Sequence, residues 1–322
     1  MVSRAWPTVI LILLGMSLVL LTSAFLSLPA QVVNPGVCQQ VYGSLPASIP
    51  EWLQSPVGNT DLSTANRYDY LSGQLLASGL VDSSACSSMG LNPDGSANGC
   101  GLGASRTGML AWQNRYDPSN LTISQSAGLP PKVLKAVIAV ESQFWPGADW
   151  ARVEIGLGQM TGPGADLVLR WRPGVYHGIC ALTLGEQGCL TPYVFQDNEA
   201  QRMLRGQLLK SIDVTCPECK GGINPDKGQQ AVSLLGEALT ASCQQSAYMI
   251  RAATGSNPAT LLSYEDFWRF VLANYHTGAG CLTQALRWTS SPTSWGAISA
   301  NLSPGCASGA GYIRRIEEQI KP

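Results

Sequence analysis

The segment Leu129-Pro-Pro-Lys-Val-Leu-Lys-Ala-Val-Ile-Ala-Val-Glu-Ser-Gln-Phe-Trp-Pro-Gly147 decides the fold. Its first prolines fit the first turn of a helix, and Pro146 with Gly147 is expected to end it. At about 100° per residue, one face collects the apolar side chains, which are Val133, Leu134, Val137, Ile138, Val140 and Phe144. The other face is expected to carry Lys132, Lys135, Ser142 and Gln143.

Glu141 falls in the middle of the apolar arc of this helix, in its last turn. Loss of hydration and the negative end of the helix dipole both disfavour ionisation there, so we expect a raised pKa. A carboxylic acid that is protonated near neutral pH can cleave a glycosidic bond as a general acid. Helix geometry alone leaves an alternative open, in which Glu141 is a buried glutamate with a satisfied partner or a side chain that reaches water at an edge.

The rest of the chain is also predicted to be mostly α, without a convincing run of alternating strands. Residues 31 to about 60 are expected to form a linker, 65–80 a helix and 83–107 a cysteine-stapled loop. We assign 31–110 as a linker and Gly/Cys-rich accessory region and 111–322 as one helical domain. Four cysteines with several Gly and Pro mark about 171–227 as an insertion in this domain. Helices are predicted again at 229–251 and 264–275, the second capped by Ser263.

The composition limits the function. Only 13% of the 322 residues are charged and the net charge is −1, which argues against a nucleic-acid partner. The sequence has only two histidines, His177 and His276, which argues against a histidine-based metal site or catalytic triad. No metal and no cofactor are expected.

The N-terminus and the cysteines indicate export. Residues 7–30 are apolar behind Arg4, which fits a cleaved signal peptide within residues 1–30 or a retained membrane anchor. Both interpretations place the protein outside the cytoplasm, either secreted or anchored and facing the cell wall. All ten cysteines follow this segment and are expected to form disulfides.

Sequence proximity suggests four cysteine pairs, which are Cys86–Cys100, Cys180–Cys189, Cys216–Cys219 and Cys281–Cys306. Cys38 and Cys243 are then left to close a longer loop. Half a zinc knuckle or a redox dithiol is the alternative for Cys216 and Cys219. We favour a structural bridge, because no second CxxC, nearby histidine or βαβ pattern completes either alternative.

Three motifs occur in a fixed order: Glu141-Ser142, then Gly156-Leu-Gly-Gln159, then Ala273-Asn-Tyr-His-Thr-Gly278. Together they resemble the lysozyme-like lytic transglycosylases of the soluble (SLT) type, whose motifs read Glu-Ser, Gly-Leu-Met-Gln and Ala-Tyr-Asn-Ala-Gly. The segment Gly311-Tyr-Ile-Arg-Arg-Ile316 is similar to the closing Tyr-Val-x-x-Ile helix of the family. The resemblance covers the chain from about residue 111, apart from the insertion, and implies a lysozyme-like helical domain.

The resemblance also implies the roles of individual residues. Glu141 is the single catalytic acid and base, and the sugar cleft is lined by Ser142, Gln159, Tyr275 and His276. Two positions depart from the family, because Gly158 stands where Met is frequent and His276 stands where Asn is found. Taken alone, Gln159 lies in a weak motif and Tyr275 fits a core aromatic equally well. The insertion is a candidate to cap one end of the cleft.

The implied activity is that of a peptidoglycan lytic transglycosylase acting on glycan strands. Glu141 protonates the oxygen between N-acetylmuramic acid and N-acetylglucosamine, and the C6 hydroxyl then closes a 1,6-anhydro ring. None of the other available carboxylates lies in a comparable apolar setting; they are Asp149, Glu154, Glu199, Glu237, Glu265 and Asp266. A lysozyme-like hydrolase and a non-catalytic wall-binding module stay open as alternatives.

Overall fold

The computed structural model describes residues 36–56 and 58–320. This part of the chain is mostly helical and cross-linked by disulfides, as the sequence predicts. Its strands are a short antiparallel pair, β1 (Ala148–Asp149) and β2 (Glu154–Ile155). None of its helices combines the length and the apolar character needed to cross a bilayer. The predicted signal peptide or anchor at residues 7–30 lies outside the described residues.

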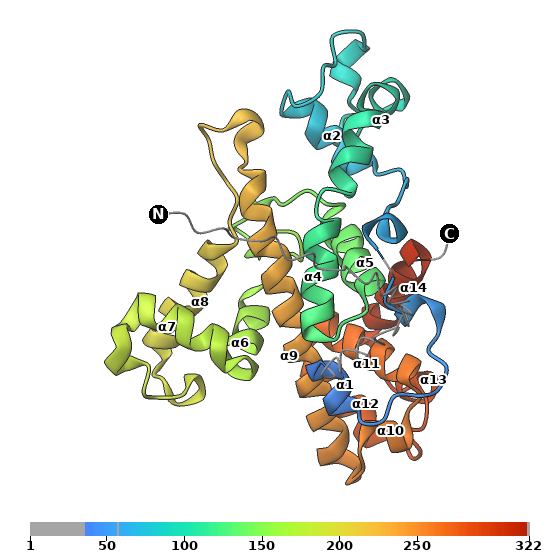
Figure 1. The fold of residues 1–322 in the computed structure, drawn as a ribbon, viewed down its shortest axis with the longest axis vertical. Helices are drawn as coiled ribbons and strands as arrows, with labels where there is room; N and C mark the ends of the chain where they lie inside the picture. Colours follow the sequence, from blue (N-terminus) through green and yellow to red (C-terminus); the bar gives the residue numbers. More distant parts are fainter. Residues whose placement is uncertain (1–35, 57, 321–322) are drawn as a thin grey trace, which may run out of the picture. The chain divides into compact units, whose positions relative to one another are not determined.

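The helices follow one another as Figure 1 shows. The first eight are α1 (Val37–Tyr42), α2 (Asp69–Ala77), α3 (Gly99–Gln113), α4 (Asp117–Ala127), α5 (Pro131–Ser142), α6 (Gly162–Trp171), α7 (Pro173–Gly188) and α8 (Asn198–Ser211). The next six are α9 (Gly228–Thr254), α10 (Pro258–Leu261), α11 (Tyr264–Thr277), α12 (Ala279–Trp288), α13 (Trp295–Ser299) and α14 (Ser308–Ile320). Short 3₁₀ turns lie at Glu51–Leu53, Asn59–Leu62, Ser87–Gly90, Tyr193–Phe195, Lys220–Gly222, Pro225–Lys227 and Pro304–Cys306.

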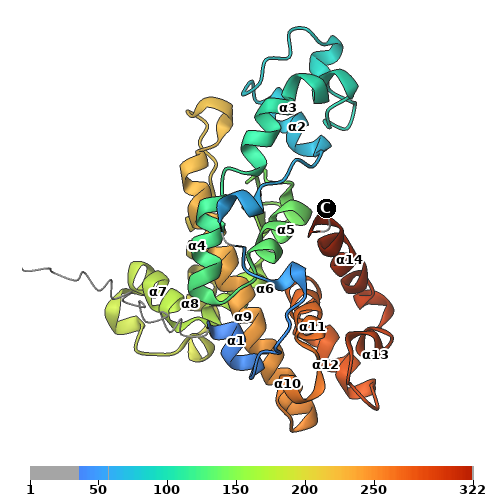
Figure 2. The same cartoon turned by 45° about the vertical axis from the view of Figure 1, so that its right-hand side comes forward.

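Helix α9 is the centre of the core. It packs against α1, α4, α6, α11 and α12, and it runs through the middle of the ribbon in Figures 1 and 2. Small and apolar residues such as Ala231, Leu235 and Leu239 are buried along its length, which suits a helix with neighbours on several sides. Gly255 ends α9 with a left-handed φ of 72°. The predicted helix at 229–251 is therefore confirmed.

Helix α5 carries Glu141 and lies between α4 and α14. Pro131 occupies its first position, as expected. The helix ends at Ser142, earlier than Pro146 would require, because Gln143 and Phe144 adopt left-handed backbone angles, with φ of 45° and 65°. This early end leaves Glu141 in the penultimate position of the helix.

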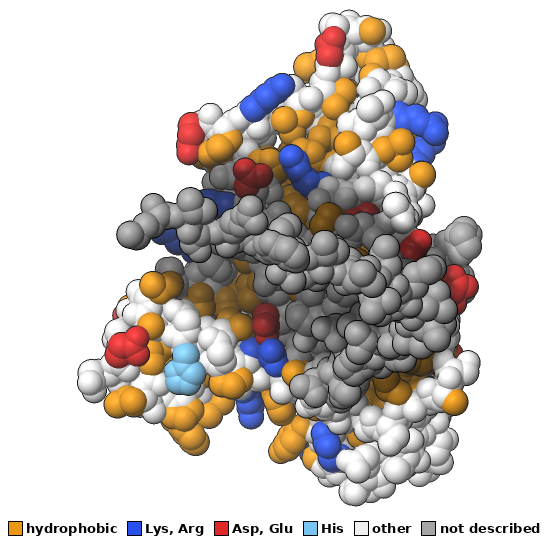
Figure 3. Space-filling view, in the orientation of Figure 1, with side chains coloured by type: hydrophobic (Ala, Val, Ile, Leu, Met, Phe, Trp, Pro, Cys, Tyr) orange, Lys and Arg blue, Asp and Glu red, His pale blue; other side chains and the backbone are white. Residues whose placement is uncertain are grey.

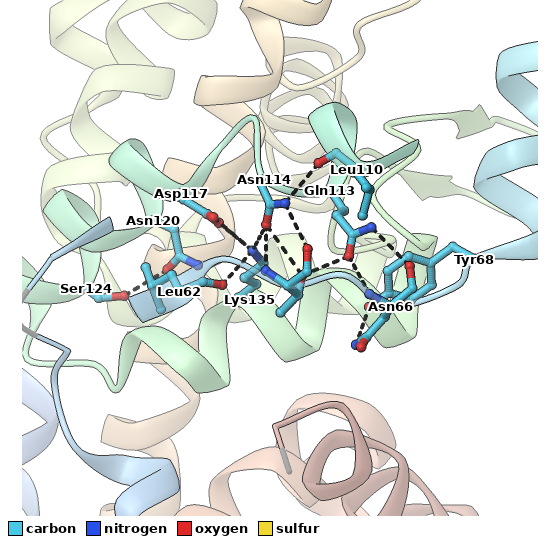
Figure 4. A network of polar contacts seen from close by, with 11 residues as sticks. Leu62, Asn66, Tyr68, Leu110, Gln113, Asn114, Asp117, Asn120, Ser124 and Lys135 are labelled. Carbon is cyan, nitrogen blue, oxygen red and sulfur yellow. Dashed lines mark hydrogen bonds and ion pairs between the residues drawn. The ribbon is translucent and has the colours of Figure 1, made fainter. Parts of the chain in front are cut away.

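The expected position of Lys135 on a solvent-facing side of this helix is wrong, because its side chain is buried. Its Nζ lies 2.7–2.9 Å from three oxygen groups, on Leu62, Asn114 and Asp117, as Figure 4 shows. The three protons of the ammonium group thus each have an acceptor. The helical wheel placed Lys135 on the polar face correctly, but that face is covered by α4 and by the segment around Leu62.

The predicted linker at residues 31 to about 60 is wrong for the residues from 36 onward. Helix α1 packs on α9, and Cys38 is buried and bonded to Cys243. Leu53 and Leu62 are also buried. Residues 36–56 and 58–320 therefore belong to one compact unit.

The predicted loop at 83–107 is helical in its second half. Asn98 caps α3, because its Oδ1 accepts from the backbone N–H of Gly101 at 3.0 Å. Helix α3 then continues to Gln113. The expected domain boundary at residue 110 consequently falls inside a helix, and the glycines at 101 and 103 belong to that helix.

The predicted insertion at about 171–227 contains two helices, α7 and α8, which pack on each other and on α6. Several apolar side chains of this part are strongly exposed, at 77–79% for Leu182, Leu190 and Phe195. Figure 3 shows hydrophobic side chains on the surface at the lower left, where α7 and α8 lie.

Five disulfides link the described residues: Cys38–Cys243, Cys86–Cys100, Cys180–Cys189, Cys216–Cys219 and Cys281–Cys306. These are the pairs that sequence proximity suggests. They fit a protein that folds in an oxidising compartment.

Candidate active site

Four of the five expected site residues line one cavity. Glu141 comes from α5, Gln159 from the turn after β2, and Tyr275 and His276 from the end of α11. The cavity has a volume of about 240 Å³. Residues that are 135 positions apart in the sequence are thus brought to one place by the packing of α5 and α11 around α14.

Burial dominates the electrostatics of Glu141. Burial is the main reason why the pKa of this carboxyl is raised from 4.5 to about 7. The hydroxyl of Tyr312 and the charge of Arg315 lower the pKa, whereas the charge of Glu154 raises it. Glu141 is therefore protonated in a sizeable fraction of molecules at neutral pH. Such a group can donate a proton and take it back within one reaction cycle.

Tyr275 joins two of the motifs. Its hydroxyl donates to the backbone oxygen of Gly158 at 2.6 Å. Burial, together with the nearby charge of Glu141, raises the pKa of Tyr275 well above its usual value, so the phenol stays protonated. A Cβ at position 158 would come within 2.9 Å of the Tyr275 oxygen and 2.7 Å of Leu235 Cδ1. This close approach explains why glycine stands at 158 in this chain.

Gln159 is held by a tight turn. Backbone hydrogen bonds between Ile155 and Met160 close the turn in both directions, at 2.9 and 3.1 Å. Gly156 and Gln159 both have left-handed φ, at 74° and 47°. The Gln159 side-chain NH₂ donates to the oxygen of Gly156 at 2.8 Å. This bond fixes the amide at the cavity, with its carbonyl oxygen available as an acceptor.

His276 lies flat against Tyr312, with ring centroids 4.3 Å apart and planes 5° from parallel. Burial and the charge of Arg315 lower the pKa of His276, which favours the neutral ring at neutral pH. A neutral imidazole both donates and accepts hydrogen bonds. His276 therefore suits a lining role, as expected from the lack of an acidic partner.

Ser142 lies next to the cavity but is turned to its own helix. The side chain is buried, and its hydroxyl donates to the oxygen of Ile138 at 3.0 Å. It borders the neighbouring space and not the cavity that holds Tyr275. Among the five expected residues, Ser142 alone is thus separated from the group.

Sequence reasoning missed three neighbours of Glu141. Tyr312 and Arg315 come from α14, and Glu154 comes from β2. The hydroxyl of Tyr312 is buried near the Glu141 carboxyl, and no group among the described residues forms a hydrogen bond of good geometry with it. The similarity of 311–316 to a family motif was the available signal for Tyr312 and Arg315. Glu154 was among the available carboxylates and precedes the Gly156 motif by two residues, but no signal in the sequence placed it beside Glu141.

The cavity continues on both sides. Toward β1 it adjoins a space of about 650 Å³, which shares Glu141, Glu154 and Gln159 as lining residues. Toward α6 and α8 it adjoins another of about 600 Å³, which shares Tyr275 and His276. Glu141 therefore stands along a trench of three adjoining spaces, which suits a polymer better than a small ligand.

Comparison with known proteins gives no match. No family model, no curated protein and no solved structure matches the chain. The residues and their geometry are therefore what indicates a function.

Metal ligation finds little support. Among residues 36–56 and 58–320, one group of three side chains has metal-ligand spacing, namely Cys216, Glu218 and Cys219. Both cysteines are joined in a disulfide, so neither offers a free thiolate. This agrees with the structural bridge that we favoured for the pair.

Proposed function

We propose that the protein is a peptidoglycan lytic transglycosylase with a lysozyme-like helical domain. The observation that carries the proposal is Glu141, a buried carboxyl with a pKa raised to about 7, standing along a trench that also holds Gln159, Tyr275 and His276. The order of the three motifs along the chain supports the same activity. The proposed substrate is a glycan strand of alternating N-acetylmuramic acid and N-acetylglucosamine.

In the first step, Glu141 gives its proton to the oxygen that bridges muramic C1 and the neighbouring sugar. The C1–O bond breaks, and the acetamido oxygen of the muramic sugar bonds to C1 and stabilises it. In the second step, the Glu141 carboxylate takes the proton of the C6 hydroxyl. The C6 oxygen then bonds to C1 and displaces the acetamido oxygen. Glu141 ends the cycle protonated, and no water is consumed.

The surrounding groups support this sequence of proton transfers. Burial keeps Glu141 protonated before cleavage, while the Tyr312 hydroxyl and Arg315 stabilise the carboxylate that forms afterwards. The pKa near 7 lets one group serve as acid and as base. The Gln159 amide and the His276 ring supply donors and acceptors for an N-acetyl group.

A lysozyme-like hydrolase is the second candidate, and Glu154 is the observation that favours it. Glu154 lines the same cavity as Glu141, and its charge adds to the effect of burial, which is the main cause of the raised Glu141 pKa. Most glycoside hydrolases use two carboxylates, one as the acid and one as the nucleophile or base. However, Glu154 lies 3.6 Å from the Arg152 guanidinium, so its charge is already partly engaged.

The deciding experiment is mass spectrometry of the products released from purified peptidoglycan. A transglycosylase yields 1,6-anhydromuramic ends, which are lighter by one water than the reducing ends from a hydrolase. Glu141→Gln should abolish release in either case. Binding to peptidoglycan without release by the wild-type protein would select the non-catalytic wall-binding alternative.

We further propose that the protein acts outside the cytoplasm. Five disulfides support an oxidising compartment. The apolar segment at 7–30 would serve as a signal peptide or as an anchor. N-terminal sequencing of the protein from membrane and soluble fractions distinguishes the two.

A further inference from the structure

Helices α2 and α3 lie outside the stretch that resembles the transglycosylase family, yet they are fixed to the end of α5. Gln143, two residues after Glu141, accepts hydrogen bonds at its Oε1 from the backbone N–H groups of Tyr70 and Leu71, at 3.0 and 3.4 Å. These N–H groups belong to the first turn of α2, which has no side-chain cap of its own. A residue beside the proposed catalytic acid therefore caps α2.

A second attachment uses tryptophans. Trp112 of α3 donates its ring N–H to the oxygen of Phe144 at 2.8 Å, and its ring stacks on Trp145 with centroids 5.6 Å apart. Both contacts fall within four residues of Glu141. The start of α2 is thus held in a defined position relative to the catalytic acid.

Tyr70 is the residue that this arrangement presents to the trench. Its side chain is 44% exposed and lines the 650 Å³ space together with Glu141 and Gln159. Tyr68, two residues earlier, is only 5% exposed and packs edge-on against Phe144. Tyr68 is thus a core residue, whereas the ring of Tyr70 is open to the trench.

Paired charges line the same space. The Arg152 guanidinium donates to Asp149 at 2.8 Å and lies 3.6 Å from Glu154. All three side chains are at least one-third exposed. Burial raises the pKa of Tyr70 and the Arg152 charge partly offsets this, so the charged group acts on the phenol. Donors, acceptors and an aromatic face therefore border one space.

A pyranose ring has the matching chemistry. Its axial C–H bonds give it an apolar face, which stacks on an aromatic ring, and its hydroxyl groups bond to charged side chains at its edge. Because Arg152 is already paired with carboxylates, the space suits a hydroxyl-rich ring better than an isolated anion.

We propose that Tyr70 is the stacking platform of a sugar-binding subsite beside Glu141, built by α2 and not by the transglycosylase-like part of the chain. The subsite binds one pyranose ring of the glycan strand, with Asp149 and Arg152 at the hydroxyl groups. This inference rests on the proposed function and gives helix α2 a role in binding the substrate.

Binding of peptide-free glycan strands tests the subsite. The full chain with Glu141→Gln is the parent, so that turnover does not interfere, and calorimetry gives the affinity. Adding Tyr70→Ala should weaken binding of long strands about tenfold, which corresponds to ~1.4 kcal/mol. Tyr70→Phe keeps the ring and should stay within about twofold of the parent, a change of ~0.4 kcal/mol.

Tyr248→Ala is the matched control. Tyr248 is an exposed tyrosine on α9 that lines none of the three spaces of the trench. Its removal should leave glycan affinity unchanged. The thermal transition of each variant is recorded in parallel, and that of Tyr70→Ala should match the parent.

The outcomes are distinct. Unchanged binding by Tyr70→Ala, or an equal loss in Tyr70→Phe and Tyr70→Ala, overturns the stacking role while the proposed function stands. An equal loss in Tyr248→Ala overturns it as well. A parent that binds peptide-bearing muropeptides but no peptide-free strand overturns the sugar assignment of the subsite. A parent that binds neither overturns the proposed function itself.

Discussion

The hydroxyl of Tyr275 donates to the backbone oxygen of Gly158 at 2.6 Å, and this bond fastens the end of α11 to the turn that carries Gln159. Both partners border the same cavity as Glu141. Two of the three sequence motifs are therefore connected in space by one direct contact.

Gly158→Ala should disturb this contact. The new Cβ would lie 2.9 Å from the Tyr275 oxygen and 2.7 Å from Leu235 Cδ1, so at least one side chain has to move. We expect a loss of about 1–3 kcal/mol in the free energy of unfolding and a large fall in kcat/KM, both measured on the purified variant. Gly206→Ala is the control, because nothing lies within 4 Å of a Cβ there; this exposed helical site should become slightly more stable. A Gly158→Ala variant with wild-type activity would contradict the positioning role of the contact.

The pH profile should follow the protonation of Glu141. The protonated form of Glu141 is the proposed proton donor and its pKa is about 7, so kcat/KM should fall as the pH rises above 7. Glu154→Gln removes a like charge that raises this pKa, so the alkaline limb should move to lower pH while cleavage persists. Turbidity loss of peptidoglycan suspensions across pH gives the profile. Complete loss of activity in Glu154→Gln would point to a second catalytic carboxylate and to hydrolysis.

Glu141 should also make stability depend on pH. Between pH 4.5 and about 7 the folded protein keeps a proton on Glu141 that the unfolded chain has released. Stability from this group therefore falls as the pH rises through that window. At about pH 8, Glu141→Gln should be more stable than the wild type by at most about 3 kcal/mol. The difference should disappear below pH 4.5 in urea titrations; a constant difference at all pH values would exclude an elevated pKa.

Lys135 should matter for folding and not for catalysis. Lys135→Met leaves the buried carboxylate of Asp117 without its cation, which should cost about 3–5 kcal/mol. The double variant with Asp117→Leu should recover part of this loss, because no charge is then left buried. Lys132→Met, on the same helix, removes a pair with the exposed Glu51 and should cost less than about 1 kcal/mol. Denaturant unfolding of the wild type and the three variants measures these differences in stability. Equal losses of stability in Lys132→Met and Lys135→Met would contradict the role of the buried ion pair.

The parts of the fold that depend on short stretches of sequence were predictable. Apolar spacing indicated α5, α9 and α11, and Ser263 does cap α11, accepting from the backbone N–H of Asp266 at 3.0 Å. The five cysteine pairs followed from proximity and parity. The helices and the cap depend on residues that are close in sequence. The cysteine pairs depend on the few ways in which neighbouring cysteines can be joined.

The remaining features depend on contacts that the local sequence does not encode. The polar face of α5 lies under another part of the chain, so Lys135 is buried. A high content of Pro, Ser and Gly with few charges suggested a linker around residue 38, but a disulfide and α9 hold that segment. The candidate site was predictable for Glu141, Gln159, Tyr275 and His276, which lie in motifs. Glu154 and Tyr70 reach the trench only through tertiary packing.

The bond between Cys38 and Cys243 spans 205 residues. During synthesis, the first cysteine has no native partner until three-quarters of the polypeptide has been made. Earlier oxidation can only join it to a wrong thiol, since six other cysteines emerge from the ribosome or translocon before Cys243 does. Maturation of the chain therefore calls for a thiol–disulfide isomerase, or for a delay that keeps the first cysteine reduced until its partner arrives.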